Sequence, residues 1–114
     1  MLKHFIFVRN DINLNTGALL AQVSHVSIKC VLEFLSDPDC YTFINQTDMT
    51  TIILQVNEDE YCELKEYLSS NSQVSFVEWL EQPENVMTAL AVKPLEIEKE
   101  KEFMKFIKKY KLFK

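Results

Sequence analysis

TGALLAQVSH, residues 16–25, holds the only glycine of this 114-residue chain and follows the apolar run FIFV at residues 5–8. A lone glycine at such a junction predicts backbone that turns sharply or lies close to a neighbouring group. Residues three and four apart are neighbours on a helix. The helix face that follows the glycine carries Ala18, Gln22, His25 and Lys29. Because open α/β sheets bind ligands beyond the carboxyl ends of their strands, a functional site is expected at this junction.

The spacing of apolar residues predicts the elements of the fold. Apolar runs between polar turns predict strands at residues 4–9, 50–56, 74–80 and 86–92. Helical spacing predicts a first helix at about 17–35 with Thr16 as its N-cap. A second helix is predicted to begin at a capping box at 57–60 and to end at residues 69–72. A third is predicted after Lys93-Pro94, with the apolar stripe Phe103, Phe106, Ile107 and Tyr110. Residues 36–47 are predicted to form a loop. The expected fold is one α/β domain over residues 1–114, a three-layer sandwich with a four-stranded mixed sheet flanked by helices.

Composition narrows the class of protein. A chain of 114 residues that is 47% hydrophobic can bury roughly 65% of its unfolded surface in one core. Its three cysteines have no CxxC spacing, so they indicate neither a disulfide framework nor a zinc site and favour a reducing compartment. Neither a signal peptide nor a membrane span is apparent, and a GxGxxG, Walker or HExxH motif is absent. We expect a cytoplasmic protein without metal, cofactor or membrane contact.

Charge is distributed unevenly along the chain. Residues 1–92 hold thirteen acidic and four basic side chains, whereas residues 93–114 hold four acidic and eight basic ones, and the net charge is −5. Clustered lysines attract phosphate, which makes Lys105, Lys108 and Lys109 candidates for contacting nucleic acid. The alternative, which is the commoner case, is that these lysines only solvate a terminal helix and complement its dipole.

Several stretches together resemble one protein family. Val8-Arg9-Asn10-Asp11, GALLAQ at residues 17–22 and Ser24-His25 resemble the opening of the archaeal and eukaryotic, type-2 peptidyl-tRNA hydrolases. WLEQPEN at 79–85 and KLFK at 111–114 are similar to a divergent branch of that family. The resemblance covers nearly the whole chain in matching order. It implies a four-stranded mixed sheet flanked by helices and hydrolysis of the ester between a peptide and the terminal ribose of tRNA.

The resemblance also implies a set of site residues. Family members have a lysine directly after the glycine that corresponds to Gly17, but here that position is Ala18. Their catalytic aspartate lies in a segment that is several residues shorter here, where Glu81 is the nearest carboxylate. Their hydroxyl residues have only Thr88 and, less closely, Asn85 as counterparts.

The missing lysine is a chemical loss. Removing one group that stabilises the oxyanion of ester hydrolysis typically costs on the order of a hundred- to a thousandfold in rate. Lys29 lies about 16 Å further along the helix, too far to replace it, which leaves Arg9 and Lys93 as substitute cations.

Each remaining candidate has a functional and a structural interpretation. Glu81 is the candidate for activating water, or else a solvated hairpin acid. His25 can act as an acid or base near neutral pH, although a histidine packed on a strand is more often structural. Gln22 is expected to position a loop or a substrate group. Asp11 orients a basic group or, by default, caps the loop before the first helix. Trp79 is expected in the core.

Two functions therefore remain open. The first is a peptidyl-tRNA hydrolase that uses Glu81, His25 and Gln22 for catalysis. The residues expected to bind its substrate are Asp11, Gly17, Ala18, Asn85, Thr88, Lys105, Lys108 and Lys109. The second is a non-catalytic module that binds tRNA or a protein partner through a groove over the first helix. The expected partner is peptidyl-tRNA or tRNA, and a homodimer is one assembly that the sequence leaves open.

Overall fold

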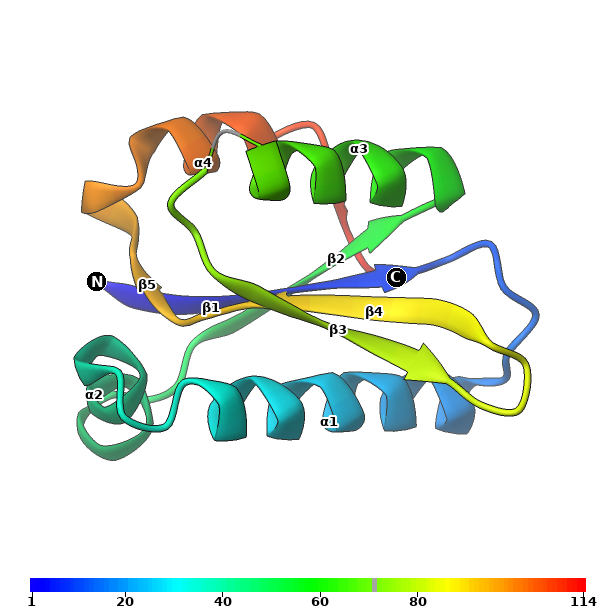
Figure 1. Cartoon of the computed structure of the whole chain (residues 1–114), viewed down its shortest axis with the longest axis horizontal. Coiled ribbons are helices and arrows are strands. Elements are labelled where there is room, and N and C mark those ends of the chain that lie inside the picture. Colours follow the sequence, from blue (N-terminus) through cyan, green and yellow to red (C-terminus); the bar gives the residue numbers. More distant parts are fainter. Residues whose placement is uncertain (71) are drawn as a thin grey trace.

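The computed structural model describes residues 1–70 and 72–114, and within them the chain folds into helices on both faces of one sheet (Figure 1). The helices are α1 (Thr16–Glu33), α2 (Pro38–Gln46), α3 (Glu58–Ser70), the 3₁₀-helix η1 (Ile97–Lys99) and α4 (Lys101–Ile107). The strands are β1 (Leu2–Arg9), β2 (Thr51–Val56), β3 (Phe76–Glu81), β4 (Val86–Val92), β5 (Leu95–Glu96) and β6 (Lys111–Leu112). The predicted α/β class is confirmed.

The sheet is mixed, as predicted, but it has six strands rather than four in the described part of the chain. Its order is β3-β4-β1-β2-β6, and β5 pairs with the start of β1. β1 and β2 are parallel, while the other pairs are antiparallel. The four-strand prediction missed β5 and β6 because two residues are too few to show an apolar alternation.

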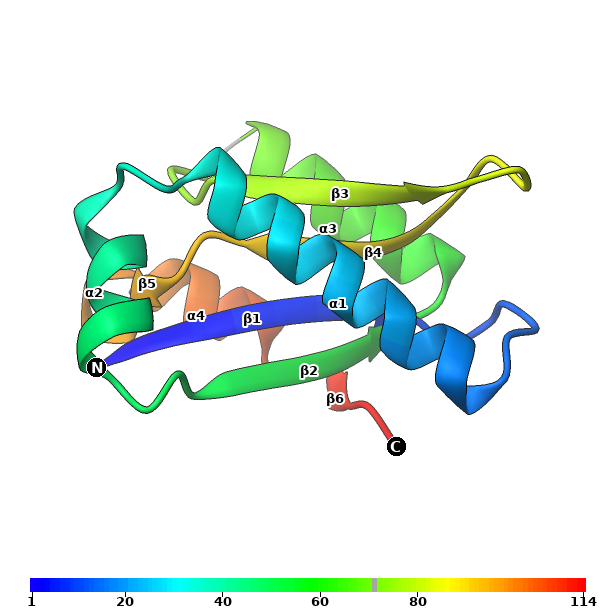
Figure 2. The same ribbon diagram turned by 90° about the horizontal axis from the view of Figure 1, so that it is seen from below.

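The strand β1 lies at the centre of the sheet and separates two cores. Phe5 and Phe7 face the core beneath α3 and α4, whereas Ile6 and Val8 face the core beneath α1. Figures 1 and 2 show α1 and α2 on one face of the sheet and α3 and α4 on the other. Because β1 is buried on both faces, its sequence is a continuous apolar run rather than an alternating one.

The amino end of α1 differs from the prediction at two residues. Asn15, not Thr16, is the N-cap, and its side chain accepts a hydrogen bond of 2.8 Å from the backbone N–H of Ala18. Gly17 lies in the first turn with a negative φ, and a Cβ there would meet Asn15 Oδ1 only at an ordinary 3.6 Å. The sharp bend expected at Gly17 is therefore wrong, since the chain turns before α1 and the helix itself accepts any small residue at this position.

The predicted loop at residues 36–47 contains the helix α2, so that prediction was wrong. Asp37 caps α2 by accepting hydrogen bonds from the N–H groups of Asp39 and Cys40, and Pro38 occupies the first helical position. Proline at this position lacks only an N–H that would have no helical partner anyway. The triplet Asp37-Pro38-Asp39 was thus a helix start rather than a turn.

The other helices follow the prediction more closely. The capping box at 57–60 is confirmed, because Asn57 Oδ1 accepts from the N–H of Glu60 and Glu60 Oε1 accepts from the N–H of Asn57. α3 ends at Ser70, and Asn71, part of the predicted helix end, lies outside the described residues.

In α4, Phe103 and Ile107 enter the core as predicted, while Tyr110 lies beyond the helix end but is also buried. Across residues 1–70 and 72–114, every helix is too short or too polar to span a membrane.

Candidate active site

The site expected at the end of β1 lies where several chain segments meet. β1, β2 and β3 run in the same direction, so their carboxyl ends share one edge of the sheet with the start of β4. Figures 1 and 2 both place the β3–β4 hairpin and the amino end of α1 at this same end of the molecule. Side chains from α1, β3 and β4 can therefore meet there.

Four of these side chains form one hydrogen-bonded chain, which we call the α1-side cluster: Gln22, Trp79, Glu81 and Thr88. Thr88 Oγ1 donates to Gln22 Oε1 at 2.7 Å, and Gln22 Nε2 donates to Glu81 Oε2 at 3.0 Å. The Trp79 indole N–H donates to Glu81 Oε1, also at 3.0 Å. Gln22 and Thr88 are 1% and 2% exposed, so the buried end of the cluster is held rigidly beneath α1.

A β-bulge explains how Thr88 reaches this cluster. Trp79 pairs with Ala89 and the next residue, Leu80, pairs with Met87, so Thr88 is the extra residue of β4. Ala89 and Ala91 face α1, so a regular strand would turn Thr88 towards the opposite face. A bulge shifts the alternation by one residue, and here it directs the Thr88 hydroxyl to Gln22.

Glu81 carries the carboxylate of the cluster. Hydrogen bonds from Trp79 and then Gln22, together with attraction to His25, hold the pKa of the Glu81 carboxyl below its usual range. The carboxylate is therefore ionised at neutral pH. Among the residues that the structure describes, it forms an ion pair with neither lysine nor arginine. Each oxygen retains a lone pair that can accept a hydrogen bond from water.

His25 lies on α1 and packs against Trp79 of β3. The two ring centroids are 4.8 Å apart with an interplanar angle of 34°, so the imidazole rests against the indole face. Both rings border a groove along α1 that also contacts Ile28, Lys29 and Leu32. The structure thus brings together three of the sequence candidates, Gln22, His25 and Glu81, with Thr88 as a fourth.

Comparison with known proteins shows the family of this chain. The family model described as peptidyl-tRNA hydrolase PTH2 matches residues 2–113. The chain belongs to the PTH2 family. Two relatives named "Putative peptidyl-tRNA hydrolase PTRHD1", from Mus musculus and Homo sapiens, are 29% and 28% identical to it over 121 residues. Each match covers 100% of this chain and 84% of the relative. PTRHD1, peptidyl-tRNA hydrolase domain-containing protein 1, is the divergent branch to which the sequence pointed.

The position of the family lysine is occupied by Ala18 at the start of α1. Its N–H is held by the Asn15 cap, and its carbonyl accepts a weaker hydrogen bond of 3.2 Å from Gln22 Nε2. The suggested substitute cations lie elsewhere. Lys93 pairs with Asp37 at 3.0 Å beside α2. Lys29, which the sequence analysis excluded as a substitute, donates to the backbone carbonyl of Glu78 at 2.7 Å.

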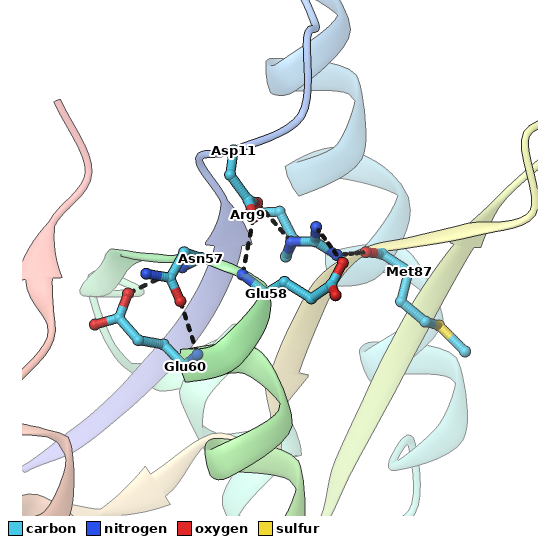
Figure 3. A network of polar contacts seen from close by, with 6 residues as sticks. All are labelled: Arg9, Asp11, Asn57, Glu58, Glu60 and Met87. Carbon is cyan, nitrogen blue, oxygen red and sulfur yellow. Dashed lines mark hydrogen bonds and ion pairs between the residues drawn. The ribbon is translucent and has the colours of Figure 1, made fainter.

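Arg9, the other suggested cation, belongs to a second cluster on the opposite face of the sheet, shown in Figure 3. We call Arg9, Asp11 and Glu58 the α3-side cluster. Arg9 Nε donates to Asp11 Oδ1 at 2.7 Å, and Arg9 also lies 3.5 Å from Glu58 and 3.3 Å from the Met87 carbonyl. Asp11 Oδ2 accepts from the Glu58 N–H at 2.9 Å. Arg9 is only 9% exposed, and the proximity of its guanidinium lowers the pKa of Asp11. Asp11 thus orients a basic group and ties the end of β1 to α3.

The remaining candidates are not brought to the α1-side cluster. Lys105, Lys108 and Lys109 belong to α4 or the turn after it, which lies on the face of the sheet opposite α1 (Figure 1). Lys109 Nζ is 3.0 Å from Glu63 and 4.0 Å from the Phe106 ring centre, which favours the solvating interpretation of these lysines. Asn85 lies in the hairpin with a φ of 61° and accepts a hydrogen bond from Gln82.

Trp79 is the site residue that the sequence analysis missed. It was assigned to the core, and it does pack, partly buried, against the core beneath α1, but its N–H also holds Glu81. A usable signal was present, because residues two apart in a strand point to the same face. Trp79 is two positions before Glu81, so the two side chains lie side by side once β3 extends to Glu81.

Proposed function

We propose that this PTH2 family member hydrolyses the ester between a peptide and tRNA, with the α1-side cluster as its active site. The relatives from mouse and man carry the name of a peptidyl-tRNA hydrolase over the full length of this chain. The observation that carries the proposal is the hydrogen-bonded chain from Thr88 through Gln22 to Glu81, which links three positions that the family resemblance singled out.

The cluster can activate water without a metal ion. Glu81 accepts a hydrogen bond from a water molecule, whose oxygen attacks the ester carbonyl while the proton passes to the carboxylate. The tetrahedral intermediate then breaks its bond to the ribose oxygen, which takes that proton and leaves as a hydroxyl. Gln22 and Trp79 keep the carboxylate oriented, and the positive end of the α1 dipole lies beside the site to favour the negative charge that develops.

The absence of a lysine at position 18 lowers the expected rate. A helix dipole stabilises charge less than a nearby ammonium group does, so turnover is expected on the order of a hundredfold or more below that of a site that keeps the cation. Slow hydrolysis, rather than none, is the expected behaviour of this chain.

Release of free tRNA from peptidyl-tRNA tests the proposal. The wild type is expected to show measurable turnover, Ala18→Lys to raise it, and Glu81→Gln to abolish it. Glu84→Gln is the matched control, because Glu84 is an exposed acid in the same hairpin. Background rates in the wild type and in Ala18→Lys would overturn the proposal and favour the non-catalytic module.

We further propose that the protein acts in the cytoplasm as one domain. The homodimer is the assembly that the sequence left open. All three cysteines are free, which suits a reducing compartment. Sedimentation at micromolar concentration distinguishes the monomer from the homodimer.

A further inference from the structure

We propose that the groove between α1 and β3 binds the apolar side chain of the amino acid that is esterified to tRNA. This inference rests on the proposed hydrolase function and adds to it the part of the substrate that the site selects. The groove is lined by His25, Ile28, Lys29, Leu32 and Trp79 and has a volume of about 270 Å³.

The groove is continuous with the α1-side cluster through Trp79. One edge of the indole donates its N–H to Glu81, while the rest of the ring, with His25 against it, forms part of the groove lining. A carbonyl attacked by water on Glu81 therefore lies at one end of the groove. The group attached directly to that carbonyl carbon is the aminoacyl residue, so its side chain is the part of the substrate nearest to the groove.

The chemistry of the groove suits an apolar side chain rather than the nucleotide. Ile28 and Leu32 are 58% and 69% exposed, so two large apolar side chains face solvent in the absence of a ligand. The only lysine in the lining, Lys29, already donates to the carbonyl of Glu78 and is poorly placed to hold a phosphate.

The size of the groove agrees with this occupant. Pockets for drug-sized ligands typically measure roughly 300–1,000 Å³, so a groove of about 270 Å³ fits one side chain better than a nucleoside with its phosphate.

A second apolar groove on the other side of α1 provides an internal control. It measures about 220 Å³ and is lined by Val8, Leu19, Leu20, Val23, Ile53 and Phe113. It lies over β1 and β2, away from β3 and Glu81. Leu20 is 65% exposed, close to the exposure of Leu32 on the same helix, so Leu20→Ser matches the groove substitutions without touching the proposed subsite.

The test compares substrates that differ in one side chain. A single tRNA is acylated with N-acetylleucine or with N-acetylasparagine, which are similar in size but differ in polarity, and kcat/KM is measured for each. In the Ile28→Ser/Leu32→Ser double variant, the leucine-to-asparagine ratio is expected to fall roughly tenfold from its wild-type value, because small changes in apolar contact alter kcat/KM by about that factor or more. Leu20→Ser is expected to keep the wild-type ratio. Thermal unfolding of both variants checks their stability, which substitutions at these three exposed positions should leave nearly unchanged.

The outcomes separate the subsite from the reaction. If the wild type hydrolyses neither substrate, the proposed function fails and the subsite with it. If the wild type is active but the double variant keeps the ratio, only the subsite is wrong. An equal rise of KM for both substrates in the double variant would assign the groove to tRNA. A fall of the leucine-to-asparagine ratio in Leu20→Ser would assign the side chain to the other groove. Either result overturns the inference.

Discussion

Two clusters of polar side chains lie at the same end of the sheet, one on its α1 side and one on its α3 side. In the α3-side cluster, the buried guanidinium of Arg9 is compensated by the carboxylates of Asp11 and Glu58 (Figure 3). In the α1-side cluster, the carboxylate of Glu81 is held by two neutral N–H donors. A compensated charge is suited to fastening chain segments together, whereas a carboxylate held by neutral donors keeps capacity to bind water and move a proton.

The two faces of β1 explain why Arg9 does not replace the family lysine. The side chains of Arg9 and Val8 alternate across β1, and Val8 faces α1. Arg9 therefore points to the α3 side, where two carboxylates already occupy its donors. A cation at the carboxyl end of the central strand precedes α1 directly in the sequence but lies on the side of the sheet opposite the α1-side cluster.

Removing the cation of the α3-side cluster should affect the fold most. Arg9→Met leaves Asp11 and Glu58 without their partner. The side chains of these two residues are 34% and 74% exposed, so water can solvate the carboxylates, and the cost is that of the lost charge-assisted hydrogen bonds of the buried guanidinium, about 2–3 kcal/mol. For a domain of this size we expect the Tm to fall by about 10 °C. Urea unfolding measures the loss. Turnover of the folded fraction should fall less than about tenfold. A variant as stable as the wild type would show that this cluster does not fasten the fold.

The pH dependence of stability should arise outside both clusters, at His4. Burial lowers the pKa of His4 from 6.5 to about 4, although a hydrogen bond to the Val92 carbonyl partly opposes the shift. The unfolded chain therefore binds a proton near pH 6.5 that the folded chain refuses until about pH 4. Neutral His4 therefore contributes stability to the folded state above pH 6.5. About 3 kcal/mol of the free energy of unfolding is lost as the pH falls from 6.5 to about 4.

Urea unfolding across that window checks the His4 prediction. His4→Leu should remove most of the slope, and its persistence would assign the slope to other groups. In His4→Leu, acid loss of activity can then be attributed to Glu81 rather than to unfolding.

The buried link of the α1-side cluster should matter to both stability and activity. Gln22→Leu removes one donor to Glu81 and leaves the Thr88 hydroxyl without its acceptor, which costs about 1–3 kcal/mol. We expect kcat/KM to fall at least about tenfold. Thr88→Val is the matched control, since it keeps the Gln22–Glu81 bond and should lose less activity. Equal activity losses in both variants would show that the Gln22–Glu81 contact has no special role.

The smallest effect is expected from Trp79. Trp79→Phe keeps an aromatic ring but removes the N–H that contributes most to the lowered pKa of Glu81. The pKa of Glu81 should therefore rise. Because activity requires the ionised carboxylate, the acid limb of the kcat/KM profile should move to higher pH, while the rate on the alkaline plateau changes little. An unmoved acid limb would remove Trp79 from the positioning of Glu81.

The sequence was sufficient for the elements whose signals are local. The four longer strands, α1 and the capping box of α3 follow from apolar runs and from the side chains of Asn57 and Glu60. The helix α2 was missed because Asp37-Pro38-Asp39 suits a turn as well as a helix start, and only the residues that follow, up to Gln46, decide between them. β5 and β6 form only through pairing with distant strands.

The candidate site could be predicted only in part, because it depends on the faces of the sheet. Gln22, His25 and Glu81 were found from spacing and family resemblance, and the structure brings them together. The position of Thr88 beside Gln22 depends on a β-bulge, which the sequence of β4 does not predict. Lys105, Lys108 and Lys109 are separated from the site because α4 and α1 cover opposite faces of the sheet. Apolar spacing within a helix does not specify which face the helix covers.

Turnover of peptidyl-tRNA by Glu81→Gln and by Asp11→Asn, measured side by side, tests most directly whether the two clusters divide chemistry from stability. Each variant removes one carboxylate charge at the same end of the sheet with almost no change of shape. We predict that Glu81→Gln loses at least about a hundredfold in kcat/KM with little change in Tm, while Asp11→Asn lowers the Tm and keeps the activity of its folded fraction. Wild-type turnover in Glu81→Gln would contradict this division of roles, and so would an activity loss in Asp11→Asn as large as that in Glu81→Gln.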